Sequence, residues 1–456
     1  MMSYLFTIIP FLLVIILAIL LPVILLASYR HFMFGATLII GIWLVQAIMM
    51  QVGYIQLGLQ IYYTDFVLLI IGAIAGLRFL LADDYPKRHW AWTVFAVVLV
   101  ISMVLGLASF GTQAGVQARN YYYFLAAGLY AMSFPMDDVR IKKLLRLLGV
   151  VAIFLVILCI YRWTVYYTPI TALLPPGGAY NVDGAIRVVR SMEALLLVEM
   201  LVVGLFFYKL IQWLRFWTPM LFGAVVTLQH RSVWLAGIVG VLCSFAIGRS
   251  ARSSRPIQIL LIVSIAVMTA LPMVFSDKLS GVANQIGSSA QRALAGKDTT
   301  AERMSSWKEI IKKWAGAGPK SILIGQSFGA DMSRDVGGLG KVRKIDYQAH
   351  NMYVQTLFNT GLLGLGALLI IIFYVIRGLY KLAQSEGDNP VAEVLLVLVL
   401  MQTAYYVPYG VDFLQSFIFG VAFAYLATRK NSDLGRSDVV RKKADTALYV
   451  YRYIRE

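Results

Sequence analysis

Apolar runs about 20 residues long recur from one end of the chain to the other. A run of this length crosses the hydrocarbon core of a bilayer as a helix, because about 20 residues at 1.5 Å each cover about 30 Å. The runs lie near residues 4–27, 33–52, 64–82, 90–110, 119–135, 143–167, 191–209, 215–229, 232–248, 256–275, 351–377, 391–408 and 412–428. The alternating pattern of a membrane β-barrel is not seen. The sequence therefore predicts an all-α polytopic membrane protein with about 12–14 transmembrane helices.

The composition supports the same class of protein. Apolar residues make up 60% of the chain and charged residues only 14%, which excludes an ordinary soluble protein. The net charge of +17 would suit nucleic acid, yet the basic residues flank the apolar runs. Positive-inside bias and contact with anionic lipid account for that placement, so we expect membrane lipids and not nucleic acid as partners. Cys159 and Cys243 lie within apolar runs and are interpreted as small apolar residues.

Charge asymmetry between the connecting segments predicts the orientation. Basic residues recur in segments that fall on one side if the spans alternate, namely those around 30, 87–88, 140–146, 209–215, 249–255, 377–381 and the tail from 429. The opposite short segments, near 53–63 and 408–412, contain no Lys or Arg. By the positive-inside rule the basic side is cytoplasmic. The first apolar run has no basic segment before it, so we expect an uncleaved first span with a translocated N-terminus.

These assignments divide the chain into four parts. We expect an N-terminal transmembrane bundle at 1–275, a large external loop at 276–350, C-terminal transmembrane helices at 351–428 and a basic cytoplasmic tail at 429–456. The external side also includes the shorter segment 168–190.

The large loop contains one amphipathic stretch. Met304, Trp307, Ile311 and Trp314 recur at helical spacing, while lysines occupy the other side. Such a helix suits either the outer membrane interface or a small core within the loop itself. The Gly-rich piece at 325–340 is expected to be a flexible loop, and it follows no predicted strand, so a phosphate-binding fingerprint is not supported.

A polar stripe opens the apolar run that follows this loop. Asn351, Gln355 and Asn359 fall at i, i+4 and i+8, so they line one face of a helix. On a membrane helix such a stripe bonds to a neighbouring helix or lines a wet cavity. His350 comes directly before it, and an imidazole with an ordinary pKa of about 6.5 accepts a proton from a hydroxyl at neutral pH. His350 is a candidate general base; the alternative is a polar residue that only begins the helix.

Arginines gather near the expected external face. They are Arg119, Arg187, Arg190, Arg231 and Arg303. The planar guanidinium binds pyrophosphate oxygens bidentately and keeps its charge, so an anionic ligand would explain arginines at membrane depth. The alternatives are snorkelling to headgroups or pairing with Glu193 or Glu199. The external side has no cluster of His or Cys and no Asp-x-Asp pair, so we expect no metal and no cofactor.

Four motifs in order make the chain resemble the bacterial O-antigen ligase and Wzy-type polysaccharide polymerase superfamily. The first is Arg-Ser-Val-Trp-Leu-Ala, which opens a span at Arg231. An Arg-x-x-x-Trp element follows in the large loop at Arg303, and then Ile-Gly-Gln-Ser-Phe-Gly from Ile324. The last is His-Asn-x-Tyr-x-Gln followed by Gly-x-x-Gly, from His350 to Gly364. The resemblance covers about 190–377, and this chain has Gln-His before Arg231 where family members often have a small pair such as Gly-Ser.

The resemblance implies glycosyl transfer on the periplasmic side of a bacterial inner membrane. The donor would be a glycan linked to undecaprenyl pyrophosphate, the acceptor a glycan hydroxyl, and the anomeric centre would invert without a metal. With that chemistry, His350 would deprotonate the acceptor, and Arg187, Arg190, Arg231 and Arg303 would hold the pyrophosphate. From their positions, Asn351, Gln355 and Arg119 are candidate substrate-lining residues. Asn351, Gln355 and Asn359 would either fix the histidine ring or bind sugar hydroxyls.

Polymerisation of repeat units is favoured narrowly over ligation to lipid A–core, since each polysaccharide pathway needs its own polymerase. A transporter or flippase of lipid-linked glycans is the alternative of a different class. Paired repeats with interrupted helices would be expected of a transporter, and the sequence has no such internal repeat.

Overall fold

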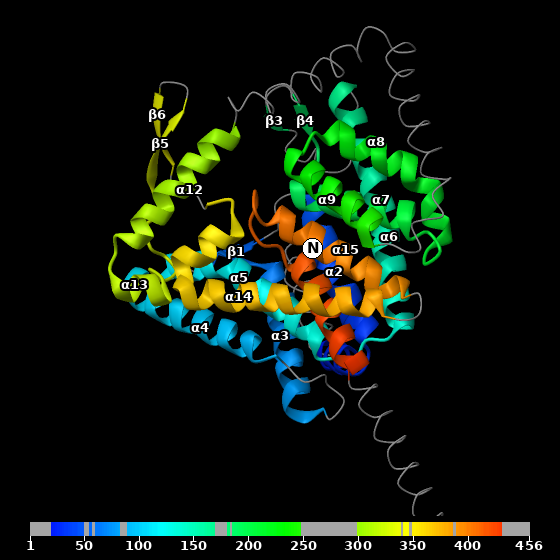
Figure 1. Cartoon of the computed structure of the whole chain (residues 1–456), viewed down its shortest axis with the longest axis horizontal. Helices are drawn as coiled ribbons and strands as arrows, with labels where there is room; N and C mark the ends of the chain where they lie inside the picture. Colours follow the sequence, from blue (N-terminus) through cyan, green and yellow to red (C-terminus); the bar gives the residue numbers. More distant parts are fainter. Residues whose placement is uncertain are drawn as a thin grey trace, which may run out of the picture.

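Helices account for most of the computed structural model, which describes residues 20–49, 54–56, 60–82, 89–168, 180–182, 185–247, 299–338, 341–345, 349–385 and 389–430. The helices are Leu20–Arg30, α2 (Phe32–Met49), α3 (Tyr63–Leu81), α4 (Trp90–Phe110), α5 (Thr112–Met132), α6 (Asp138–Tyr167), α7 (Ser191–Phe206), α8 (Thr218–Leu228), α9 (Arg231–Ile247), α12 (Thr299–Ala315), α13 (Pro319–Ile324), α14 (Met352–Gln384), α15 (Pro390–Tyr405) and a last helix at 413–430. Figure 1 shows α4 and α14 side by side, with α6 to α9 grouped away from α12 and α13.

The prediction of an all-α polytopic membrane protein is confirmed. Within the described part of the chain, five helices are long and apolar enough to cross a bilayer: α2, α3, α4, α6 and α14. The expected span at 215–229 is broken, however, into a 3-10 helix (Gln212–Trp217) and α8, whose 11 residues cover only about 16 Å. The expected span at 256–275 and the start of the one at 4–27 lie outside the described residues.

Short antiparallel hairpins occur in three connecting segments. They pair β1 (Tyr54–Gln56) with β2 (Gln60–Tyr62), β3 (Tyr180–Val182) with β4 (Ala185–Arg187), and β5 (Arg334–Gly338) with β6 (Lys341–Ile345). The expectation of a flexible loop throughout 325–340 was therefore wrong. Its second part includes strand β5, and in its first part Phe328 is fully buried.

At each end of the bundle, hydrogen bonds join helices to one another and to the connecting segments. At one end the Trp43 Nε1–H donates to Asp412 Oδ2 (2.8 Å), and Arg303 donates to the Pro408 carbonyl (3.0 Å). At the other end Arg78 donates to the Tyr29 carbonyl (2.6 Å). This grouping agrees with alternating spans, because segments expected on one side of the membrane meet at one end.

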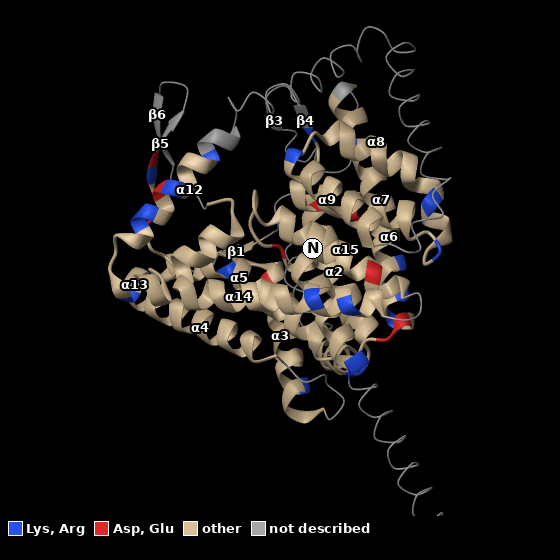
Figure 2. Ribbon diagram, viewed as in Figure 1, with Lys and Arg blue, Asp and Glu red and all other residues tan. Residues whose placement is uncertain are grey.

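Charged side chains are sparse along the middle of the helices and more frequent at their ends, as Figure 2 shows. Arg162, near the end of α6, is nevertheless fully buried. Its guanidinium donates to the carbonyls of Ala47 and Ile48 (3.0 and 2.6 Å) and of Val188 (2.8 Å). Ala47 and Ile48 end α2, and carbonyls at a helix C-terminus lack intrahelical donors and carry partial negative charge. Arg162 therefore joins α2, α6 and the segment before α7.

α14 is interrupted at Gly361, where φ is +65° and ψ is −164°. The turn packs directly on the start of the loop after α13: a Cβ added at Gly361 would lie 2.3 Å from the Leu323 carbonyl oxygen, and one added at Gly325 would lie 2.3 Å from the Asn359 carbonyl carbon. The Gln326 N–H donates to the Phe358 carbonyl across the same contact (2.8 Å). The motif that begins at Ile324 and the motif that begins at His350 thus contact each other through their backbones. Only glycine fits at positions 325 and 361.

The large loop has a small core of its own. Ile310, Met332, Ala349 and Phe358 are buried together there, with Trp307 and Trp314 packed against them. The Trp307 Nε1–H donates to the Ala349 carbonyl (2.8 Å). Of the two interpretations of the amphipathic helix, packing on a loop core is therefore the one observed for the tryptophans.

Replacement of Gly361 by alanine should destabilise the protein. The left-handed backbone costs a non-glycine residue about 1–2 kcal/mol, and the added methyl group would also push the 323–325 segment away. The measurement is the melting temperature of the detergent-purified protein. Gly366→Ala is the control, because it lies in the same helix and a Cβ there meets nothing within 4 Å. Equal melting temperatures for both variants would contradict this account.

Candidate functional site

His350 is held at the point where the large loop meets α14. The Asn351 side chain caps the helix by accepting from the Val354 N–H (3.0 Å). The Met352 N–H donates to the carbonyls of Tyr406 and Tyr409, each at 3.0 Å. These bonds fasten the start of α14 to the segment 406–412 between α15 and the last helix. As a result the His350 ring lies 6.0 Å from the Tyr409 ring, centroid to centroid.

Two arginines of the large loop surround this histidine. The Arg303 guanidinium lies 5.4 Å from the centre of the Tyr409 ring, close enough for a cation–π contact. Arg334 is buried and donates to Ser306 Oγ (2.6 Å) and to the Met332 carbonyl (2.9 Å). Burial, and then the charges of Arg303 and Arg334, lower the pKa of His350 to about 4. The imidazole is therefore neutral at pH 7, and the same burial and charges make it a weaker base than an ordinary histidine.

A second group of arginines lies between the segment before α7 and the turn between α8 and α9. Arg187 donates to the Gln229 carbonyl (3.3 Å), and a ring nitrogen of His230 bonds the Val189 carbonyl (3.0 Å). Burial, and then the charge of Arg187, lower the pKa of His230 to about 3, so this histidine is a neutral structural tie. Together the two bonds place Arg231, which begins α9, beside the 187–190 segment.

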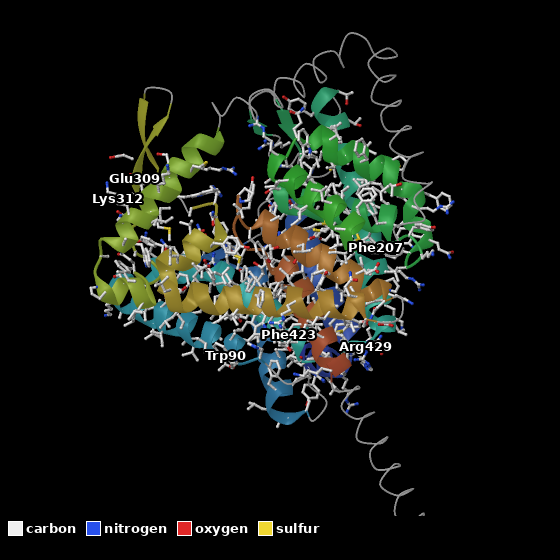
Figure 3. The ribbon with its side chains drawn as sticks, viewed as in Figure 1. Trp90, Phe207, Glu309, Lys312, Phe423 and Arg429 are labelled. Carbon is white, nitrogen blue, oxygen red and sulfur yellow. The ribbon has the colours of Figure 1, made fainter. Side chains whose placement is uncertain are left out.

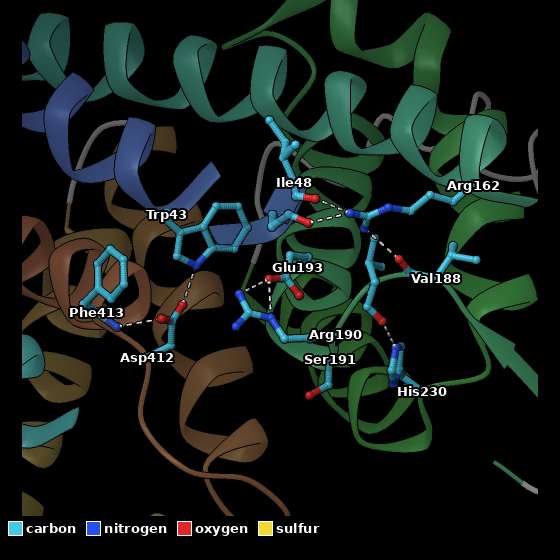
Figure 4. A network of polar contacts seen from close by, with 12 residues as sticks. Trp43, Ile48, Arg162, Val188, Arg190, Ser191, Glu193, His230, Asp412 and Phe413 are labelled. Carbon is cyan, nitrogen blue, oxygen red and sulfur yellow. Dashed lines mark hydrogen bonds and ion pairs between the residues drawn. The ribbon is translucent and has the colours of Figure 1, made fainter. Parts of the chain in front are cut away.

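Arg190 is paired within its own helix start. Its guanidinium contacts the fully buried Glu193 carboxylate, with Nε at 2.8 Å and the ion pair at 2.5 Å (Figure 4). Pairing with Glu193 was the alternative to a ligand role, and the structure contains that pair. Arg190 therefore carries less uncompensated charge toward a ligand than Arg187 does.

A pair of tyrosines connects the two arginine groups. The Tyr405 and Tyr409 rings stack in parallel with centroids 5.1 Å apart. The Tyr405 hydroxyl donates to Ser191 Oγ (2.7 Å), next to Arg190, while Tyr409 contacts His350 and Arg303. The site thus consists of His350, Arg303 and Arg334 at one tyrosine and the Arg187–Arg190–Arg231 group at the other.

Arg334, Tyr405 and Tyr409 were not among the residues predicted from sequence. Three tyrosines between 405 and 409, in an external segment without Lys or Arg, were the available signal for the aromatic pair. Nothing in the local sequence distinguishes Arg334 from the other basic residues of its hairpin, because its burial depends on Ser306 of α12.

Of the other predicted residues, Arg119 has structural partners, whereas the buried Asn359 side-chain amide has no hydrogen-bond partner within the described part of the chain. Arg119 forms an ion pair with Asp65 (3.2 Å) and donates to the Gln60 carbonyl (2.6 Å), which places it at the β1–β2 hairpin. Gln355 and Asn359 are buried. The Ser102 hydroxyl of α4 donates to the Asn359 backbone carbonyl (2.7 Å), so α14 packs on α4 at this point.

Left-handed backbone marks the turns that carry the motifs. Among the described residues, the non-glycine positions with positive φ are Gln229 (51°), Ser327 (69°) and His350 (46°). Gln229 lies two residues before Arg231, and it adopts a left-handed conformation that glycine enters freely. Strained positions of this kind persist where surrounding contacts fix them, and they cluster at functional sites.

Within the described part of the chain, no group of three or more His, Cys, Asp or Glu side chains is placed to hold a metal ion. A comparison with curated proteins finds no sequence that matches this chain. Residues 216–369 match the family model described as O-antigen ligase. This segment contains Arg231, Arg303, Arg334 and His350. Over residues 216–369 the chain is thus similar to the O-antigen ligase family, which supports the resemblance to the O-antigen ligase and Wzy-type polymerase superfamily that the sequence motifs indicate.

Proposed function

We propose that this protein is a membrane glycosyltransferase of the bacterial inner membrane, acting on its periplasmic side. The donor is a glycan linked to undecaprenyl pyrophosphate and the acceptor is a glycan hydroxyl. The observation that carries this proposal is His350, a neutral histidine beside Arg303 and Arg334, two cations that suit a departing pyrophosphate. The family match over 216–369 supports the same class of reaction.

The residues suggest a direct displacement. His350 takes the proton of the acceptor hydroxyl as its oxygen forms a bond to the anomeric carbon. The bond from that carbon to the pyrophosphate oxygen breaks, and its electron pair leaves with the lipid pyrophosphate. Attack from the face opposite the leaving group inverts the anomeric centre. Arg187, Arg231 and Arg303 stabilise the charge on the leaving group, and this mechanism needs no metal.

An apolar groove supports a lipid-linked donor. It lies between α7, α8 and α9, has a volume of about 460 Å³, and is lined by residues such as Val198, Val225 and Trp234. Trp234 stands one helical turn from Arg231, and its indole N–H donates to the Val225 carbonyl (3.1 Å). A lipid chain in this groove would bring its pyrophosphate to Arg231.

Polymerase and ligase differ in the molecule that accepts the glycan. We favour a surface polysaccharide polymerase, whose acceptor is a second lipid-linked glycan; a ligase would transfer the chain to lipid A–core. Purified protein offered lipid-linked repeat units alone should form longer chains. Product only when lipid A–core is added would identify a ligase, and transbilayer movement of donor without any glycosidic bond would identify a flippase.

Replacement of His350 by alanine should lower turnover by about 10²–10⁴-fold, the usual contribution of a general base. The assay is product formation by purified protein in liposomes, together with a measurement of donor binding, which should persist. His31→Ala is the control, because His31 is exposed at the other end of the bundle. Normal turnover in His350→Ala would rule out histidine as the base.

Replacement of Arg231 by lysine should also impair the enzyme. Lysine keeps the charge but cannot form two parallel bonds to phosphate oxygens. Loss of a charge-assisted contact of about 1.5–3 kcal/mol corresponds to roughly ten- to hundred-fold weaker donor binding or slower turnover. Arg215→Lys, at the opposite end of the bundle, should be neutral. Full activity of both Arg231→Ala and Arg187→Ala would contradict a pyrophosphate site here.

The pH profile of kcat/KM tests the electrostatics. Because the pKa of His350 is lowered to about 4, the free enzyme should keep its activity as the pH falls through 6.5, the ordinary histidine value. Arg334→Gln removes a positive charge that disfavours the protonated ring, so the acidic limb should move to higher pH. Lys308→Gln removes the same charge from an exposed position on α12 and should leave the limb unchanged. A shift toward lower pH in Arg334→Gln would contradict this arrangement.

A further inference from the structure

A cavity of about 830 Å³ opens at the end of the bundle opposite His350. It lies between the second half of α14, the start of α4 and the last helix. Its walls are mostly apolar and include Ile370, Phe373, Tyr374 and Leu426. Figure 3 labels Arg429, which lines the cavity, far from Glu309 and Lys312 on α12. The volume falls within the range of about 300–1,000 Å³ typical of ligand pockets.

Positive charge surrounds this apolar cavity. Arg377 and Lys381 stand four residues apart on α14, and Lys430 faces them from the last helix. Within the described part of the chain none of these three forms an ion pair, whereas Arg429 is paired with Asp138 at 2.6 Å. Like charges at i and i+4 repel one another by a few tenths of a kcal/mol. An anion between them would remove this repulsion.

His89 also lines the cavity, and it lies near the charge of Lys430. Its ring lies 4.5 Å from the Tyr374 ring, and its Nδ1 accepts from the Ala91 N–H at the start of α4 (3.3 Å). Burial, and then the charge of Lys430, lower the pKa of His89. The positive charge of the rim thus comes from α14 and the last helix, and the start of α4 contributes a histidine whose protonation is disfavoured.

We propose that this cavity binds one anionic phospholipid, with its phosphate among Arg377, Lys381 and Lys430 and an acyl chain along Ile370 and Phe373. A zwitterionic lipid would add its own positive headgroup charge to the three positive side chains, and a soluble phosphate compound would not cover the apolar walls. The charges and the apolar depth together fit an amphiphile with a negative headgroup. This inference does not depend on the proposed glycosyltransferase function.

The test is lipid binding by the full-length protein in detergent, measured by native mass spectrometry with phosphatidylglycerol and phosphatidylcholine as probes. The wild-type protein should prefer phosphatidylglycerol. The double variant Arg377→Gln/Lys381→Gln should bind it about thirtyfold more weakly, since each basic residue near an anionic lipid contributes about a factor of five. The control Lys142→Gln/Arg146→Gln removes two charges at the same i, i+4 spacing from α6, outside the cavity, and should keep the preference.

A variant that fills the cavity tests whether lipid binding depends on the cavity itself or only on the positive charge around it. Ile370→Trp keeps every charge but occupies the apolar wall, so it should also lose phosphatidylglycerol. Size-exclusion chromatography establishes that each variant is folded. Equal loss in the α6 control, unchanged binding in Ile370→Trp, or equal binding of both lipids by the wild-type protein would overturn the proposal.

Discussion

The contact between Gly325 and the turn at Gly361 is the constraint on which the candidate site depends. At this point the backbones of two segments touch without any side chain between them. The contact interrupts α14 after about two and a half turns and anchors the loop that follows α13. The short helical piece 352–360 is thereby held against both the bundle and the loop core, with His350 at its outer end. A side chain at either glycine would separate these parts.

Burying a charged side chain is costly, and this cost explains the partners that the arginines have. Arg162 uses carbonyls at the end of α2, Arg303 uses the Pro408 carbonyl and Arg187 uses the Gln229 carbonyl. Carbonyl partners satisfy the guanidinium N–H groups but, unlike a carboxylate, do not cancel its full charge. Arg190 and Arg119 have carboxylate partners instead. The site therefore keeps net positive charge on some arginines while others are neutralised, and this division decides which of them suit an anionic ligand.

The sequence predicts the helical class well because length and apolar composition decide it. It also predicts the start of α14, since Asn351 is an ordinary capping residue. The role of Gly325 and the burial of Arg334 could not be predicted, because each depends on a partner distant in sequence: Asn359 for the first and Ser306 for the second. For the same reason the neutralisation of Arg119 by Asp65 escaped prediction. Local pattern identifies residues that could bind, whereas tertiary partners determine which remain charged.

The interruption of α14 also connects the site to the thickness of the bilayer. The part after the interruption, 362–384, is about 34 Å long at 1.5 Å per residue, slightly more than a hydrocarbon layer of about 30 Å. A helix longer than its bilayer tilts, and a thicker bilayer lets it stand more upright. Because the turn at Gly361 is fastened to the loop, a change in the tilt of this part would also move the start of α14, next to His350. Bilayer thickness would then bear on the position of this histidine as well as on the helix itself.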